Sequence, residues 1–191
     1  MTAHDLVDGQ TKHRLSVEEF LLLDREGAFG CRSTELIGGE VYYMSPKHRP
    51  HAQAVTEMVL ALAAGLKACG SSLRVLTDIS VRVSDHDVPE PDLVVTDAAE
   101  GDGILPVENA LLVIEISAST LATDLGPKAD LYAEADVPEY WVVDLNENRV
   151  LMHANPRPDG SGYDGQLDVP FGAPLHAATI EGLTVESAGL G

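Results

Sequence analysis

Two strand-like segments of the sequence each place one carboxylate among aliphatic residues. Asp92 lies in the segment 91–95, and Glu115 lies in the segment 112–117. A carboxylate in such surroundings is costly to bury unless it is paired, hydrogen-bonded or bound to a metal. Lys128 follows in a segment of helical pattern and adds an ammonium group. Two carboxylates and a lysine of this kind indicate metal-assisted hydrolysis.

The two carboxylates differ in how strongly they indicate a function. An aspartate directly after a proline commonly enters a strand, so Asp92 alone favours a structural role. The apolar run before Glu115 is typical of a central strand, in which alternation puts Glu115 on the same face as Val113 and Ser117. If the two strands are neighbours, both carboxylates can meet one cation, to which the backbone carbonyl of Ile116 would add an oxygen. Ligation by oxygen alone predicts Mg²⁺ or Mn²⁺ rather than zinc.

Lys128 can be interpreted in two ways. It lies one helical turn before Tyr132, so the two side chains share a face that could point to the end of the Glu115 strand. A solvated lysine is an equally good interpretation, although Lys128 is the only Lys or Arg between Arg82 and Arg149. In the functional interpretation, its ammonium orients the attacking water or stabilises the charge that develops on phosphorus.

The charge of the chain argues against a broad phosphate-binding face. The sequence has 31 acidic and 12 basic residues and a formal net charge of -19, the wrong sign for gripping nucleic acid over a large surface. The one concentrated basic stretch is 47–51, where Lys47, Arg49 and His51 are candidate contacts to DNA phosphates. A solvated loop is the commoner meaning of such a cluster, and His51 more often caps a helix end than performs chemistry. The sequence does not decide whether the protein forms a homodimer in which a second subunit extends the DNA-binding cleft.

The length and composition fit one well-buried domain, expected over residues 15–191, after a polar and disordered segment over 1–14. The N-terminus has neither the basic region nor the apolar core of a signal peptide, and no apolar run approaches a membrane span. We therefore expect a soluble, cytoplasmic protein with no membrane partner.

Apolar periodicity and turn residues predict a chain that mixes helices and strands. A capping box at Ser16–Glu19 opens a short helix, and Gly38-Gly39 is typical of a tight hairpin turn. The predicted elements are helices over 16–23, 49–69 and 124–135, and strands over 35–37, 40–44, 73–83, 92–96, 110–117, 139–144 and 149–153, followed by one or two short strands. Pro127 is expected in the first turn of the third helix.

An ordered series of motifs resembles a known family, the Uma-type putative restriction endonucleases of the PD-(D/E)XK nuclease superfamily. The resemblance runs from about Ser16 to His153. It is carried by Glu35-Leu36-Ile37-x-Gly39-Glu40, His51, Pro91-Asp92-Leu93, Glu115-x-Ser117-x-Ser119-Thr120, Asp124, Lys128, Tyr132 and Val137-Pro138-Glu139-Tyr140-Trp141-x-x-Asp144.

The resemblance implies an α/β (α+β) restriction-endonuclease-like core, with a mixed β-sheet flanked by helices and added β-hairpins. It also implies a Mg²⁺-dependent endonuclease acting on DNA. Asp92 and Glu115 would then bind the metal, Lys128 would assist the nucleophilic water, and Glu40 would be an additional acid from the hairpin. An exposed strand charge is an equally good interpretation of Glu40.

One departure from the superfamily pattern keeps other functions open. The position two after the glutamate, normally lysine, is Ser117, so the role of the lysine would pass to Lys128. A strict interpretation of the motif makes the site a relict. The protein would then be a non-catalytic binding or regulatory protein on the same fold. A metal-dependent hydrolase of another phosphate ester fits the carboxylates equally well.

Overall fold

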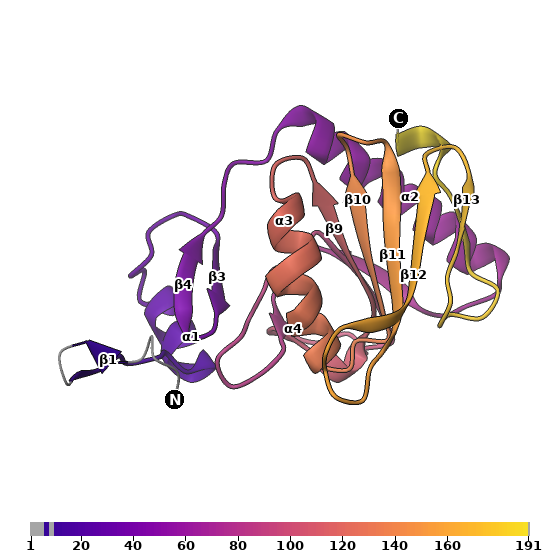
Figure 1. Ribbon diagram of the computed structural model, residues 1–191. Coiled ribbons are helices and arrows are strands. Elements are labelled where there is room, and N and C mark those ends of the chain that lie inside the picture. The colour runs from indigo at the N-terminus through magenta and orange to yellow at the C-terminus, as the bar shows by residue number, and fades with distance from the viewer. Residues whose placement is uncertain (1–5, 8–9, 191) are drawn as a thin grey trace.

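A six-stranded mixed sheet forms the centre of the molecule in the computed structural model, which describes residues 6–7 and 10–190 (Figure 1). The strand order is β12-β11-β10-β9-β7-β5. β9 and β10 are parallel, and the other neighbours in this sheet are antiparallel. The strands are β5 (Arg74–Thr77), β7 (Leu93–Thr96), β9 (Ala110–Ser117), β10 (Glu139–Asp144), β11 (Arg149–Pro156) and β12 (Tyr163–Pro170). The predicted mixed sheet flanked by helices is confirmed.

Helices cover both faces of this sheet. The long helix α2 (Arg49–Ala68) lies on one face (Figure 1). The short helix α3 (Leu121–Thr123), the π-helical turn η3 (Asp124–Lys128) and α4 (Ala129–Glu134) connect β9 to the parallel strand β10 and lie on the other face. A connection between parallel strands must cross over the sheet in this way.

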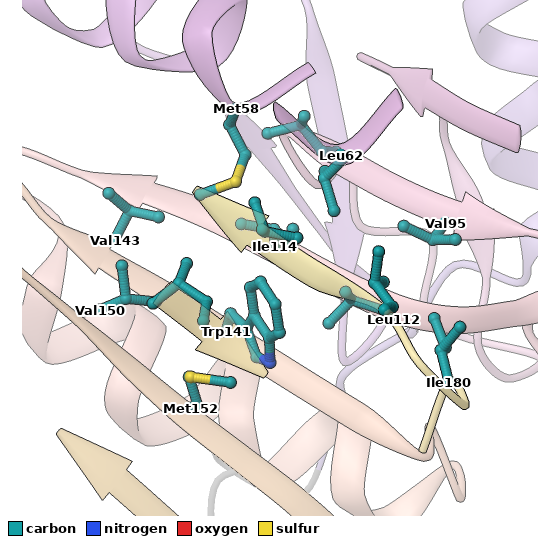
Figure 2. Close-up of a cluster of buried hydrophobic side chains, with 14 of the residues drawn as sticks. Met58, Leu62, Val95, Leu112, Ile114, Trp141, Val143, Val150, Met152 and Ile180 are labelled. Atoms are coloured by element: carbon teal, nitrogen blue, oxygen red, sulfur yellow. The ribbon is translucent and has the colours of Figure 1, made fainter. Parts of the chain in front are cut away.

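The alternation of side chains along β9 divides the core between these two layers. Leu112 and Ile114 pack in the same cluster as Met58 and Leu62 of α2, whereas Val113 packs with the α4 layer (Figure 2). Glu115 follows the same alternation and lies on the α4 side, as predicted. The core of the α2 side also contains the fully buried Trp141.

α2 presents one stripe of buried residues to the sheet. The buried stripe consists of Ala54, Met58, Leu62 and Leu66, whereas Val55 and Val59 are only partly buried at its margin. Gly65 completes this face, because a Cβ atom there would lie 2.4 Å from the carbonyl oxygen of Thr184. Glycine therefore lets α2 pack directly against the backbone of β14 (Thr184–Glu186).

Two predicted elements are interrupted. The strand expected over 73–83 is split into β5 and β6 (Val81–Arg82), because Asp78 adopts a positive φ of 49°. The helix expected over 124–135 starts earlier, at Leu121, and is kinked at Gly126, whose φ of -108° and ψ of -105° are not helical. The cause is Pro127, which disfavours helical backbone at the residue before it. Pro127 therefore lies after the kink rather than in a first turn.

The C-terminal part contains more strands than expected. β12 is eight residues long, and a separate hairpin follows it, formed by β13 (Pro174–His176) and β14. β12 lies at the edge of the central sheet and is largely exposed. Its polar composition therefore lacks the alternation by which buried strands are found.

The N-terminal part forms a small layer of one helix and one hairpin beside the sheet (Figure 1). The Ser16 capping box is confirmed at the start of α1 (Val17–Arg25). The hairpin of β3 (Thr34–Ile37) and β4 (Glu40–Tyr43) is also confirmed, with φ of 60° at Gly38 and 76° at Gly39. Leu36 exchanges backbone hydrogen bonds of 3.2 and 2.7 Å with Val88, which fixes the hairpin to the segment that leads into β7.

The segment expected to be disordered falls partly outside the described residues, at 1–5 and 8–9. Within it, β1 (Leu6–Val7) pairs with β2 (Gln10–Thr11), and the Arg14 side chain donates to the carbonyl oxygen of Gly38 at 2.7 Å. None of the helices in the described chain is long and apolar enough to span a membrane. The remaining short elements are β8 (Leu105–Pro106), η2 (Val107–Asn109) and η4 (Ala188–Leu190).

Candidate active site

Asp92 lies directly before β7, where its carboxylate reaches the neighbouring strand β9. Its Oδ2 accepts a hydrogen bond of 2.8 Å from the backbone N–H of Ile116 and lies 3.0 Å from Nε2 of His51. Its Oδ1 lies 2.9 Å from the ammonium of Lys47. Burial by itself would raise the pKa of Asp92, but these hydrogen bonds outweigh it and lower that pKa below its usual value. Asp92 is therefore a buried anion that three donors stabilise.

Glu115 lies two residues before the end of β9 and shares a cation with a third carboxylate. Lys128 Nζ lies 2.9 Å from Oε1 of Glu115 and 2.9 Å from Oε1 of Glu35. Glu35 comes from β3, and its Oε1 also accepts a hydrogen bond of 2.9 Å from the backbone N–H of Glu90. The sheet, the η3 turn and the N-terminal hairpin thus meet at this one ammonium.

Burial and charge set the protonation of this group. Burial raises the pKa of Glu115 to about 8, and the Lys128 ammonium opposes that rise only in part. Burial works against the charge of Lys128, but the carboxylates of Glu115 and Glu35 outweigh it and hold the lysine pKa above its usual value. One ammonium thus faces two carboxylates, and it does not cancel the rise that burial causes in the pKa of Glu115.

These groups line one cavity of about 420 Å³. Its walls come from the ends of β7 and β9, the start of α2, the β3–β4 hairpin and the α3–η3 segment. Among its lining residues are Glu35, Tyr42, Tyr43, Lys47, His51, Asp92, Glu115, Ile116, Thr120, Asp124 and Lys128. The cavity brings together Asp92, Glu115, Ile116, Lys128, Lys47 and His51 from the site predicted by the sequence, and it leaves out Glu40 and Arg49.

Glu35, and not the expected Glu40, is the acid that the hairpin contributes to the cavity. Glu40 is exposed at the turn end of the hairpin, where Lys12 pairs with it and the Tyr42 hydroxyl donates to it at 3.2 Å. Glu40 lies opposite Ile37 and therefore shares the face of Glu35, but about 7 Å farther along the hairpin at the usual rise of a strand. Alternation along β3 is the sequence pattern that could have identified Glu35. Because Leu36 faces the apolar core, Glu35 beside it must face the opposite side of the strand.

Two of the three expected phosphate contacts are bonded to a carboxylate. Lys47 pairs with Asp92 and with Asp78, and His51 lies against Asp92. Arg49 is the exposed first residue of α2 and makes none of the ion pairs found within residues 10–190. Asp78 reaches Lys47 because of the break between β5 and β6, which the sequence did not indicate.

Asp124 is a further acid of the cavity to which the sequence assigned no role. Its side chain is buried, and Oδ2 accepts a hydrogen bond of 2.6 Å from the Thr120 hydroxyl. Burial raises the pKa of Asp124. Ser117, at the position of the usual lysine, is fully buried with its Oγ 3.4 Å from Oγ1 of Thr120. The ammonium of this site therefore enters from η3 rather than from the strand.

The donor set fits a hard, partly hydrated divalent cation. Asp92 and Glu115 offer carboxylate oxygens to the same cavity, while the described part of the chain contains no group of three or more His, Cys, Asp and Glu placed to hold a metal. Mg²⁺ is commonly bound through one or two carboxylates, with water and substrate oxygens completing its shell. Zinc would require a closer set of protein ligands.

Comparison with known proteins places this arrangement in a family. The fold is similar to a crystal structure described as a putative nuclease belonging to DUF820 from Anabaena variabilis ATCC 29413. The TM-score is 0.67 at 17% identity, over 92% of this chain and 97% of that chain. No curated protein sequence matches. A family model described as Uma2, putative restriction endonuclease, matches residues 17–186. The chain therefore belongs to the Uma2 family of putative restriction endonucleases.

Proposed function

We propose that the protein is a Mg²⁺- or Mn²⁺-dependent endonuclease that hydrolyses DNA phosphodiester bonds in this cavity. The observation that carries the proposal is the convergence of Asp92 and Glu115 on one cavity, with the Lys128 ammonium 2.9 Å from Glu115. The nuclease description of the family supports the same reaction class.

Each residue has a distinct part in the proposed reaction. Asp92 and Glu115 would hold the cation, with the backbone carbonyl of Ile116 as a further oxygen ligand. When bound, such a cation activates water and neutralises charge on the scissile phosphate. Lys128 would orient the attacking water or stabilise the charge that develops on phosphorus. Glu35 would position the Lys128 ammonium through its 2.9 Å ion pair.

The proposal is tested by DNA cleavage in Mg²⁺ or Mn²⁺ and in EDTA. We expect cleavage to require the metal, and Asp92→Asn or Glu115→Gln to abolish it. Lys128→Ala should lower the rate by about a hundredfold or more, the usual effect of removing one stabilising donor. Glu40→Gln is the matched control, because Glu40 is exposed and outside the cavity. Wild-type cleavage by either carboxylate variant would contradict the assigned site.

A non-catalytic binding function is the second candidate. Two observations favour it: Lys47 already occupies a position beside Asp92, and the lysine of the general motif is replaced by the buried Ser117. Such a relict should not bind Mn²⁺ through Asp92 and Glu115. A metal-dependent hydrolase of another phosphate ester would instead cleave small phosphodiesters in preference to DNA. A screen of both substrate types therefore separates the candidates.

A further inference from the structure

The carboxylates and the lysine of the cavity are recessed. Only 6% of the Glu115 side chain, 7% of Asp92 and 11% of Lys128 is exposed. A scissile phosphate must come to these groups for the proposed reaction. Duplex DNA is stiff, with a persistence length of about 150 base pairs, and bending it costs free energy. A recessed site therefore favours a flexible, unpaired strand.

Two adjacent tyrosines on β4 line the same cavity and remain half-exposed. The exposed fractions are 50% for Tyr42 and 51% for Tyr43. The other large apolar side chains that are exposed within residues 11–190 are Leu22, Leu60 and Leu167, on three separate elements. Aromatic rings at a cavity bind unpaired bases by stacking, which every base permits through its π-face. Bases inside a duplex are already stacked on one another and do not offer these faces.

Arg32 extends this aromatic surface. Its guanidinium lies 4.4 Å from the centre of the Tyr43 ring. Within residues 10–190 it makes no ion pair, so its charge is available to a phosphate. A cation held against a stacking ring is a recurring feature of sites for single strands.

A second cavity continues the path of a strand beyond the active site. It has a volume of about 730 Å³, is lined by Arg32, and shares the segment 44–47 with the active-site cavity. One of its acidic side chains, Asp78, is compensated by an ion pair with Lys47. The two cavities are thus adjacent, and the Arg32–Tyr43 pair lies at their junction.

The overall charge of the chain also favours binding of a single strand over binding of a duplex. With a net charge of -19, the chain has few cations with which to follow the phosphates of a duplex. Base stacking supplies affinity without adding cations, by about 1 to 3 kcal/mol per base, or about 5- to 150-fold. We therefore propose that the two adjacent cavities take one unpaired DNA strand, with bases stacked on Tyr42 and Tyr43 and a phosphate on Arg32. This inference rests on the proposed nuclease function, whose substrate class it names.

The test compares binding of a labelled single strand and of the duplex with the same sequence, by fluorescence anisotropy in Ca²⁺. We expect the wild-type protein to bind the single strand at least about tenfold more tightly. Tyr43→Ala and Arg32→Ala should each weaken single-strand binding by about five- to tenfold and leave duplex binding unchanged. Tyr43→Phe should retain the affinity, because the ring remains. Leu167→Ala is the matched control, since Leu167 is exposed on the edge strand β12.

Cleavage of the same two substrates in Mg²⁺ separates this inference from the proposed function. Cleavage that requires Asp92, combined with equal or tighter binding of the duplex, overturns the inference and leaves the nuclease function intact. Unchanged single-strand affinity in both Tyr43→Ala and Arg32→Ala also overturns it. Single-strand binding that depends on Tyr43, without any cleavage, upholds the stacking surface and contradicts the nuclease function.

Discussion

The ammonium of Lys128 lies 2.9 Å from a carboxylate oxygen of Glu35, although 93 positions separate these residues in the sequence. This contact joins the N-terminal hairpin to the turn that follows the central strand β9. It also means that the lysine beside Glu115 is held from two sides. A side chain held in this way has fewer conformations to lose when it acts on a substrate.

The hairpin acid that matters should be Glu35 rather than Glu40. Glu35→Gln removes the charge that positions Lys128, and we expect it to lower metal-dependent DNA cleavage by roughly 10- to 100-fold, as for other groups that orient active-site residues. Glu40→Gln should leave the rate within a factor of about two, because Glu40 lies outside the cavity. Cleavage rates at saturating Mg²⁺ decide between them. Equal losses in both variants would contradict the assignment.

Glu115→Gln should stabilise the metal-free protein at alkaline pH. The pKa of Glu115 is raised from 4.5 to about 8, so the folded state keeps a proton that the unfolded chain has lost. This contribution to stability is complete below about pH 4.5 and is lost as the pH rises to about 8. Glutamine has no such proton to lose. The variant should therefore gain about 4 kcal/mol of stability relative to wild type between pH 5 and pH 8.5.

Urea unfolding of the two proteins across this pH range measures the difference. Asp92→Asn should show the opposite pH dependence, because the pKa of Asp92 is lowered and its charge is stabilised by three donors. That variant should be less stable than wild type at neutral pH, and its deficit should shrink as the pH falls. A pH-independent gain in Glu115→Gln would exclude burial of an ionisable Glu115 as the cause.

Lys47 should compete with the cation in the metal-free protein. Its ammonium lies 2.9 Å from Oδ1 of Asp92. A divalent ion bound by Asp92 would take the place of this ammonium as the positive charge beside the carboxylate. Lys47→Ala should therefore tighten Mn²⁺ binding by about fivefold, equivalent to about 1 kcal/mol for a partly exposed pair. Arg49→Ala is the control from the same basic segment, and it should leave the affinity unchanged. Isothermal titration in the absence of DNA measures both, and weaker binding in Lys47→Ala would rule out the competition.

Glu139 should be a structural acid. It is fully buried, and its carboxylate accepts hydrogen bonds from the Trp141 indole at 2.7 Å and from the backbone and hydroxyl of Thr179 at 2.9 and 2.8 Å. In Glu139→Gln, the amide NH₂ group would replace one accepting oxygen and face donors that then lack an acceptor. This change should lower the free energy of unfolding by about 3 kcal/mol. Glu181→Gln, exposed in the same region, is the control. If the Glu139 variant instead kept its stability and lost cleavage, the acid would belong to the reaction.

Much of the central sheet could be predicted because its strands are buried runs of aliphatic residues. The juxtaposition of Asp92 and Glu115 followed from two such strands being neighbours, as the pairing of Leu93 with Ile114 now shows. The family resemblance was also confirmed. These features depend on local patterns and on short connections along the chain.

The contacts that complete the cavity depend on long-range packing, and local patterns do not reveal them. Lys128 meets Glu35 only because Leu36 is fixed to Val88 and carries the hairpin beside η3. Lys47 meets Asp78 only because a positive φ at Asp78 breaks a strand that looked continuous. A pattern of apolar residues shows which face of a strand is buried, but not which distant side chain lies opposite.

Asp92 and Glu115 should hold one divalent ion between them. Anomalous diffraction from crystals soaked in Mn²⁺, with data measured at the manganese edge, would locate this ion. We expect a single anomalous peak within about 2.5 Å of oxygens of both carboxylates, absent in crystals of Asp92→Asn. No peak in the cavity, or a peak that contacts neither Asp92 nor Glu115, would contradict it.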